Sequence, residues 1–302
     1  MPVATKEIQR RIRSVGNTKK ITKAMELVSA AKRRSAVQSV VATRKYSQTA
    51  WQIVKDLSAR TDPAHHPLLH KRDQNDNLGL ILLSSNRGLC GGFNREIVEL
   101  AAKYCNGFAE KNQAAKIEVV LVGQRGRNIM TRHHYKIVAE FTKSDVAESI
   151  TEVQALAKMV IDDYLSGKYD KVVMAYTDYH SAISQEPRLR QLLPIHSADE
   201  ELGSVDGDEM PAEKAPAYEY TFEPSPDYVL DQMLYRLIEL QIYQALLESN
   251  ASEHSARMVA MRNASDAAND MIDDLTLSFN QARQQVITAE LAEISAGRAA
   301  VS

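Results

Sequence analysis

The chain of 302 residues has few helix breakers near either end. Of its 12 glycines and 9 prolines, only Gly16 falls within residues 3–62 or 227–296. A compact enzyme carries glycine and proline in loops throughout its length, because turns require them. The lack of breakers therefore excludes a fold of evenly spaced short elements. It predicts two very long terminal helices around a conventional middle.

Cysteine and long apolar runs are also scarce. Cys90 and Cys105 are the only cysteines, too few for a disulfide framework or a zinc cluster. No run approaches the roughly 20 apolar residues that span a bilayer. The first 15 residues lack the apolar core of a secretory signal. We expect a cytosolic chain without a membrane span of its own.

Each end of the chain is short of charge of one sign. Residues 1–45 contain 12 Lys or Arg against two acids, whereas residues 227–296 contain 11 acids, four Arg and no Lys. Opposite charges on two helices can complement each other along a shared seam. A basic arm alone would indicate nucleic-acid binding. The acidic counterpart makes that the weaker interpretation.

A heptad pattern runs through the C-terminal stretch. Its seam positions, in alternating steps of three and four, are Met258, Met261, Ser265, Ala268, Ile272, Leu275, Phe279, Ala282, Val286 and Ala289. This spacing is typical of a left-handed coiled coil. The N-terminal helix offers Ile8, Ile12 and Val15, then Ile21, Met25 and Val28, with a predicted slip across residues 16–20. We expect an intramolecular antiparallel coiled coil; a homodimeric rod or a plain spacer is the alternative.

The middle of the chain alternates short aliphatic runs with helical patterns. Residues 78–85, 117–122 and 171–176 are expected to be buried, mostly parallel strands, separated by helices at 94–108, 124–131 and 145–165. The predicted class is α/β, with a central Rossmann-like domain and a long coiled coil. The expected parts are residues 1–60, the N-terminal coiled-coil helix; 75–195, the α/β domain; 196–226, an acidic connection and foot; and 227–302, the C-terminal coiled-coil helix.

The sequence contains no convincing catalytic or nucleotide-binding motif. The glycines of 88–92 follow a predicted strand with G-x-x-G-G spacing, which favours a tight turn over a dinucleotide loop. Gly167-Lys168 is followed by Tyr169, so no P-loop is present. Cys90 is expected to be a buried turn cysteine rather than a nucleophile. We predict no catalytic residue, no bound cofactor and no metal site.

Three blocks resemble the gamma subunit of F-type ATP synthases. Residues 12–28 (IRSVGNTKKITKAMELV) are similar to its opening helix, and residues 85–94 (SNRGLCGGFN) to its central turn. Residues 251–261 (ASEHSARMVAM), continuing to ARQ at 282–284 and ITAELAEI at 287–294, resemble its C-terminal helix. The resemblance covers nearly the whole chain and reaches its first residues, which favours a bacterial origin.

This resemblance implies a rotor rather than an enzyme. In the family the coiled coil stands inside a ring of three alpha and three beta subunits, which hold the nucleotides and Mg. The α/β middle, with the epsilon subunit, seats on the membrane ring of c subunits, and proton flow turns both. The chain would then lie peripherally on the cytoplasmic face of a bacterial plasma membrane and couple rotation to ATP synthesis or hydrolysis.

The resemblance also implies contact residues. Arg283, Gln284, Thr288 and Glu293 match the positions that touch the beta-subunit loops, and Met25 falls on the facing helix. Tyr220 and Glu223 match the foot on the c ring.

Two residues depart from the family pattern. Asn86 stands where an aspartate is usual, and Arg298 brings a charge into a small-residue ending. A coiled-coil scaffold, a nucleic-acid binder and a nucleotide enzyme remain as rival hypotheses.

Overall fold

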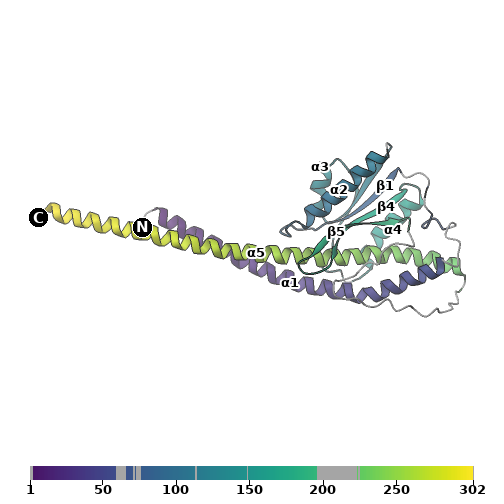
Figure 1. Cartoon of the computed structure of the whole chain (residues 1–302), viewed down its shortest axis with the longest axis horizontal. Helices are drawn as coiled ribbons and strands as arrows, with labels where there is room; N and C mark the ends of the chain where they lie inside the picture. Colours follow the sequence, from purple (N-terminus) through teal and green to yellow (C-terminus); the bar gives the residue numbers. More distant parts are fainter. Residues whose placement is uncertain are drawn as a thin grey trace. The chain divides into compact units, whose positions relative to one another are not determined.

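The computed structural model describes residues 3–58, 66–70, 72, 76–112, 114–147, 149–195, 223 and 225–301 (Figure 1). In chain order its elements are α1 (Val3–Ser58), β1 (Asn77–Leu83), α2 (Phe93–Lys111), β2 (Lys116–Val122), α3 (Arg125–Arg132), β3 (Lys136–Phe141), α4 (Thr151–Leu165), β4 (Lys171–Tyr179), β5 (Gln185–Leu193) and α5 (Pro226–Val301). The long terminal helices and the alternating middle confirm the predicted fold class. Nearly all of the predicted acidic connection lies outside the described residues.

The chain divides into two compact units, which are described separately. The sheet unit is Ala30–Arg257. The coiled-coil unit is Met1–Ser29 together with Met258–Ser302. None of the described helices contains a stretch long and apolar enough to cross a membrane.

The sheet unit is built on a five-stranded sheet with the order β3-β2-β1-β4-β5. The first four strands are parallel, and β5 is antiparallel to β4. In the register of the central strands, Ile81 lies between Val120 of β2 and Met174 of β4. The chain therefore winds outward from β1 to β3 and then returns to place β4 on the other side of β1, as in doubly wound folds.

Helices cover both faces of this sheet. One face packs Leu78, Leu80 and Leu82 of β1 against α2 and against Met130 of α3. The other face packs Ile81 and Leu83 against α4 and the early part of α5. Because strand side chains alternate, the aliphatic run of β1 supplies both cores, and this explains its continuous hydrophobicity.

The sequence did not predict the two edge strands. β3 and β5 are mostly half-buried, and β5 carries Arg188, Arg190 and Pro187. Proline lacks an amide donor and is tolerated at a sheet edge. These strands have neither a continuous apolar run nor a clean alternation, so they left no periodic signal. The helix predicted from residue 145 begins instead at Thr151.

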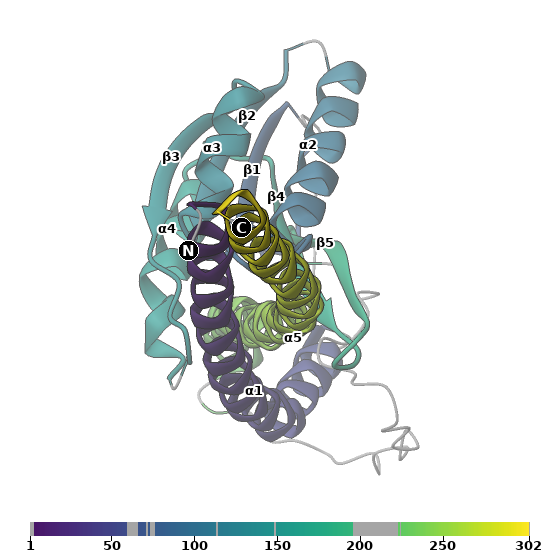
Figure 2. The same ribbon diagram turned by 90° about the vertical axis from the view of Figure 1, so that its left-hand side faces the viewer.

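In the coiled-coil unit, the first part of α1 and the last part of α5 lie side by side and run in opposite directions (Figures 1 and 2). The predicted α5 seam is confirmed as far as Val286. Met261, Ser265 and Ala268 are buried, and the later members are half-buried. Residues 287–296, which include the predicted seam member Ala289, are all exposed.

The predicted slip in the α1 seam is wrong. The less exposed positions keep strict heptad steps through Thr5, Ile8, Ile12, Val15, Lys19, Thr22, Glu26 and Ser29. The side chains of Ile21 and Val28, which were expected in the seam, are 61% and 56% exposed. Five of these eight seam positions are polar, because small hydroxyls fit closely and the stems of Lys and Glu can cover apolar surface. Met25 is half-buried beside this line.

Replacing Gly16 with alanine is expected to stabilise the chain by about 0.5–1 kcal/mol. A Cβ built at Gly16 meets nothing within 4 Å, and alanine is the better residue in a helix interior by roughly that amount. Urea unfolding followed by helical circular dichroism measures the change. The reverse change at the exposed Ala24, Ala24→Gly, is the matched control and should lose a similar amount. Destabilisation by Gly16→Ala would contradict the open surroundings of this glycine.

Candidate functional site

The carboxyl edge of the sheet contains the position where doubly wound folds bind their ligands. This position lies between β1 and β4, where the strand order reverses. In this chain α5 covers it. Ser252 Oγ donates to the carbonyls of Thr177 and Asp178, each at 3.2 Å. Arg257 Nη2 donates to the carbonyl of Arg87 at 3.1 Å. A helix of the chain itself therefore occupies the ligand position.

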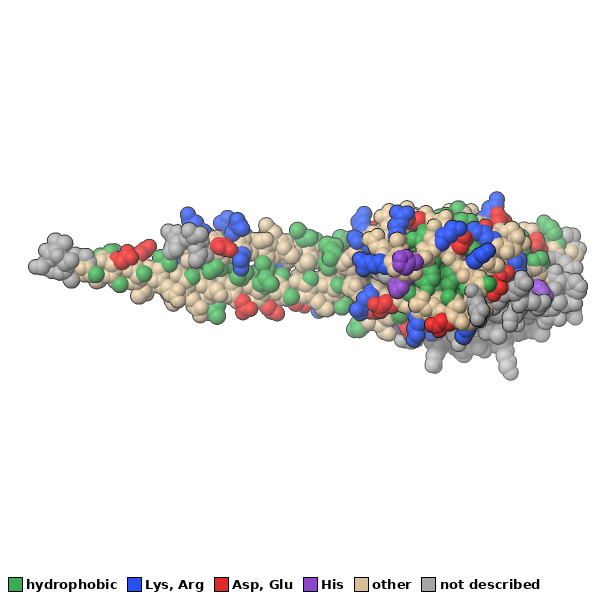
Figure 3. Space-filling model, turned by 90° about the horizontal axis from the view of Figure 1, so that it is seen from above, with side chains coloured by type: hydrophobic (Ala, Val, Ile, Leu, Met, Phe, Trp, Pro, Cys, Tyr) green, Lys and Arg blue, Asp and Glu red, His purple; other side chains and the backbone are tan. Residues whose placement is uncertain are grey.

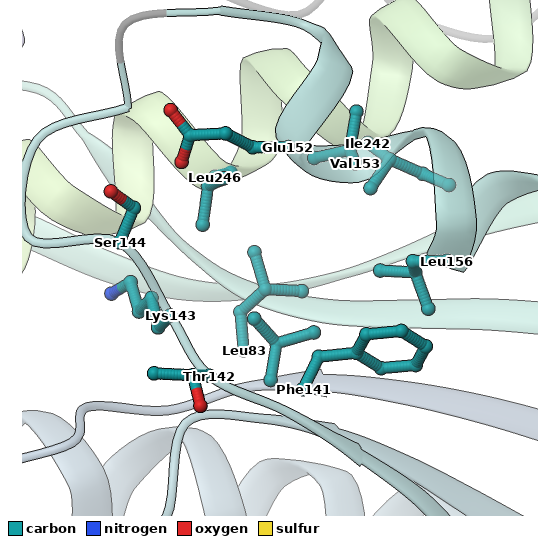
Figure 4. A pocket seen from close by; sticks show the side chains of 11 residues that line it. Leu83, Phe141, Thr142, Lys143, Ser144, Glu152, Val153, Leu156, Ile242 and Leu246 are labelled. Atoms are coloured by element: carbon teal, nitrogen blue, oxygen red, sulfur yellow. The ribbon is translucent and has the colours of Figure 1, made fainter.

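A small cavity remains next to this edge, between α4 and α5. It measures about 30 Å³ and is bounded by Leu83, Phe141, Leu156 and Ile242, with Lys143 near its rim (Figure 4). That volume suits one or two waters and is far below the several hundred Å³ of a nucleotide pocket. Among the described residues, no group of three or more His, Cys, Asp or Glu is arranged to hold a metal ion.

A buried ion-pair cluster of Lys143, Glu253 and Arg257 fastens α5 to the loops of this edge. Lys143 Nζ lies 2.8 Å from Glu253 Oε2, and Arg257 Nη2 lies 2.8 Å from Glu253 Oε1. Burial alone would raise the pKa of Glu253, but the two cations outweigh it and lower that pKa. In this cluster the single carboxylate of Glu253 is shared by the two cations.

Neighbouring polar groups extend the cluster. His254 Nε2 donates to the carbonyl of Asp145 at 2.8 Å. Burial lowers the pKa of His254, which keeps its imidazole neutral at pH 7. Lys143 Nζ also donates to Ser249 Oγ at 3.0 Å. The polar run of α5 from Ser249 to Arg257 is thus a set of anchors to the sheet.

The glycine-rich turn after β1 is held by these anchors. Asn86 donates its Nδ2 to the carbonyl of Lys143 at 2.5 Å and accepts from the amide of Lys143 at 3.3 Å. The contact at this position is therefore made by hydrogen bonds to the backbone. Cys90 is buried, which confirms the prediction of a buried turn cysteine, and burial raises the pKa of its thiol.

Leu89 at the tip of this turn is strained and exposed. Its φ is 63°, a left-handed conformation that costs a residue with a Cβ about 1–2 kcal/mol. Its side chain is 63% exposed. Non-glycine residues in this conformation gather at functional positions, where the surroundings hold them. Sequence reasoning missed Leu89, because a leucine within a glycine-rich turn carries no signal of its backbone conformation.

In the coiled-coil unit, the residues that the resemblance assigned to partner contacts are accessible. Arg283, Gln284, Thr288 and Glu293 of α5 are exposed. At about 100° per residue, the first three fall within an arc of about 140° that begins beside the seam at Arg283 and extends away from it. Glu293 instead continues the line of the seam, seven residues after Val286, where the seam has ended.

Apolar side chains share that outer arc. We define the outer stripe of α5 as the exposed residues Leu277, Arg283, Gln284, Ile287, Thr288, Leu291 and Ile294. Figure 3 shows hydrophobic side chains scattered along the surface of this unit. Apolar groups that recur at i, i+4 and i+7 on one exposed side of a helix are the pattern by which a helix docks into a groove of a partner. The i, i+4, i+7 spacing of Ile287, Leu291 and Ile294 was a readable signal, although the resemblance pointed only to their polar neighbours.

The predicted foot residues lie at the limit of the described structure. Tyr220 lies outside the described residues. Glu223 is described and exposed, three residues before α5 begins. Their contact with a c ring therefore stays a prediction.

Comparison with known proteins agrees with this organisation. The model of a family described as ATP synthase matches residues 4–301. The ATP synthase gamma chain of Roseiflexus sp. strain RS-1 is 40% identical over 300 residues, covering 99% of both chains. That of Bdellovibrio bacteriovorus is 40% identical over 297 residues, covering 98% of both.

Solved structures share the fold at lower identity. A chain in the OSCP/F1/c-ring structure of Euglena gracilis mitochondrial ATP synthase is 20% identical, with a TM-score of 0.66, and the match covers 99% of this chain and 94% of that one. A chain in the central stalk/c-ring structure from Tetrahymena thermophila is 21% identical, with a TM-score of 0.58, and the match covers 81% of this chain and 99% of that one. On the full-length identity to curated relatives and the matching fold, the chain belongs to the family of ATP synthase gamma chains.

Proposed function

We propose that this chain is the rotating shaft of an ATP synthase and performs no bond chemistry itself. Its coiled-coil unit would turn within three alpha and three beta subunits, which carry the nucleotide and Mg sites. Its sheet unit, with the epsilon subunit, would be driven by a c ring through proton flow. Supporting this, α5 covers the ligand position of the Rossmann-like sheet, and the chain has no P-loop.

The outer stripe of α5 is the observation that carries the proposal. It combines exposed apolar groups with Arg283, Gln284 and Thr288 on one side of the helix. A helix whose binding residues lie on one side would, at any moment, present that side to one of three surrounding sites and other surfaces to the remaining two. A rotor of this kind biases its neighbours through differential contact energy, which is how one protein shifts the conformational equilibrium of another.

The rival scaffold hypothesis does not fit the seam. Met261, Ser265 and Ala268 are already buried within a single chain. A homodimer formed through this seam would need those positions free. We therefore infer that the exposed outer stripe, rather than the seam, meets partner subunits. We place Met25 and Glu293 among the contacts as well, and Tyr220 and Glu223 at the c ring.

The double substitution Arg283→Ala/Gln284→Ala is expected to lower coupled ATP synthesis about tenfold without unfolding the chain. Both side chains are exposed, and truncation of an interface arginine typically costs about 1–2 kcal/mol of binding, or roughly tenfold. The measurement is ATP synthesis by the assembled complex in proteoliposomes at a fixed proton gradient.

Arg95→Ala, which removes an exposed arginine of the sheet unit, is the control and should leave synthesis unchanged. The helical circular dichroism of the variant chain checks that it is folded. If assembled complexes of the variant synthesise ATP at the wild-type rate, the outer stripe is not the surface that contacts the partner subunits.

The proposed location is the cytoplasmic face of a bacterial plasma membrane. The gamma-chain relatives named above from Roseiflexus and Bdellovibrio are bacterial. The chain would be held at the membrane through the complex. We further propose that the chain has four functional parts. These are the N-terminal shaft helix at residues 1–60, the α/β domain at 75–195, the acidic connection and foot at 196–226, and the C-terminal shaft helix at 227–302.

A further inference from the structure

Two carboxyl groups from different elements are buried together in the sheet unit. Glu248 of α5 is 1% exposed, and Asp178 at the end of β4 is 3% exposed. Aspartate and glutamate are rarely buried to this degree without matching donors. The ion-pair cluster of Lys143, Glu253 and Arg257 does not supply donors to either group in the described structure.

Asp178 is supplied with positive charge. Arg188 Nη1 of β5 lies 3.2 Å from Asp178 Oδ2, and His180 Nε2 lies 3.6 Å from the same oxygen. His180 in turn lies 3.5 Å from Glu186. These contacts join the two strands of the β4–β5 hairpin and place the guanidinium of Arg188 against the carboxylate of Asp178.

Glu248 has a different environment. Its Oε1 accepts from Gln244 Nε2 at 3.4 Å, and Gln244 Oε1 accepts from Thr43 Oγ1 of α1 at 2.8 Å. Its Oε2 is fully buried and has no hydrogen-bond donor among the described residues. The neighbouring group that it meets is the carboxylate of Asp178, itself an acceptor. Two acceptors can form a hydrogen bond only if one of them carries a proton.

We propose that Glu248 is protonated in the folded chain and donates that proton to Asp178, which makes the pair a pH-sensitive clamp between α5 and the β4–β5 hairpin. Together with the Thr43–Gln244 hydrogen bond, the shared proton ties α1, α5 and β4 into one network. Removing it would place two negative charges in contact inside the unit, and their repulsion would push the hairpin away from α5.

The other charged and titratable groups that face the pair support this assignment. Burial raises the pKa of Glu248 well above its ordinary value, the charge of Asp178 raises it further, and Arg190 of β5 only partly offsets them. Tyr176 of β4 also faces the pair, and burial raises the pKa of its hydroxyl, so it remains neutral. Arg188 forms its ion pair with Asp178.

The sign of the pH effect follows from proton counting. In the unfolded chain Glu248 ionises near 4.5, whereas in the folded chain it keeps its proton to higher pH. The folded state then binds one more proton than the unfolded state across that window. Stability from this group is complete below about pH 4.5 and falls as the pH rises toward the folded pKa, with up to a tenfold change in the unfolding constant per pH unit.

The test is Glu248→Gln in the full-length chain, with urea unfolding measured across pH 5–8. Glutamine keeps the size, donates a hydrogen bond to Asp178 and cannot ionise. In wild type the logarithm of the unfolding constant should rise by up to one unit per pH unit because of Glu248, and in the variant this contribution should be absent. The variant should therefore be more stable than wild type at pH 8. Exposed Glu99→Gln is the matched control and should keep the wild-type slope.

Two further measurements keep the proposal falsifiable if Glu248→Gln folds poorly. Infrared spectroscopy of the wild-type chain at pH 7 should show the carbonyl stretch of a protonated, buried carboxyl group. In Asp178→Asn, that band should disappear at a lower pH, because the charge that raises the pKa is gone. A wild-type chain without the band, or a Glu248→Gln variant with an unchanged pH slope, would overturn the clamp.

Discussion

Replacing Glu253 with alanine is expected to destabilise the sheet unit by about 3–5 kcal/mol, the usual cost of removing one partner from a buried ion pair. Its carboxylate is the shared partner of Lys143 and Arg257, each at 2.8 Å. Alanine would leave two buried cations without their anion. Arg257 would also hold the carbonyls of Arg87 and Gly88 less firmly, so the strained turn at Leu89 would relax.

Urea unfolding of the full-length chain at pH 7 measures this loss. Glu99→Ala serves as the control, because Glu99 forms an exposed ion pair with Arg95 at 3.8 Å, and such pairs contribute less than about 1 kcal/mol. A Glu253→Ala chain within about 1 kcal/mol of wild type would show that Lys143 and Arg257 are solvated or paired elsewhere. The ion-pair cluster would then not be what fastens α5 to the sheet.

Gly123→Ala is expected to cost about 3 kcal/mol or more, although it adds a single methyl group. Gly123 follows β2 with φ of 95°, and a Cβ there would lie 2.3 Å from the carbonyl oxygen of Ser84. Left-handed strain contributes about 1–2 kcal/mol and overpacking about 1–3 kcal/mol. Ser84 cannot move away easily, because its amide donates to Val122 at 2.8 Å and its hydroxyl donates to Gly123 at 2.9 Å.

Urea unfolding measures this loss, and Gly107→Ala is the control. The comparison shows whether the cost comes from the local geometry at Gly123 or from replacing any glycine with alanine. Gly107 lies within α2, and a Cβ there meets nothing within 4 Å, so alanine should be neutral or slightly stabilising. Equal effects at the two glycines would contradict the close approach of β2 to Ser84.

The sequence predicted those elements whose burial follows a period. The α5 seam is readable because one residue in every three or four is apolar or small, and β1 is readable because both of its faces are buried. β5 was not readable, because an edge strand tolerates Arg188 and Pro187. Patterns of hydrophobicity report burial only where the buried residues are apolar.

The errors and omissions have the same physical origin. In α1 the seam contains Thr22, Glu26 and Ser29, so a search for apolar residues selected the exposed Ile21 and Val28 instead. From the sequence alone, the buried polar side chains of α5 cannot be distinguished from those of a solvated helix surface, because their hydrogen-bond partners come from distant elements. The contact residues at 283, 284, 288 and 293 came from resemblance, and the partner subunits that would test them are not part of a single chain.

The polar seam of α1 has a consequence for assembly. Threonine, serine, lysine and glutamate fill five of its eight positions and bury less hydrocarbon than the three aliphatic residues there, so the free energy that holds the two helices of the coiled-coil unit together is reduced. Such a segment opens locally far more readily than a core strand. Subunits that bind only the closed form would stabilise it by mass action. The shaft would then become stiff enough to transmit torque only on assembly, because the surrounding subunits hold its two helices together.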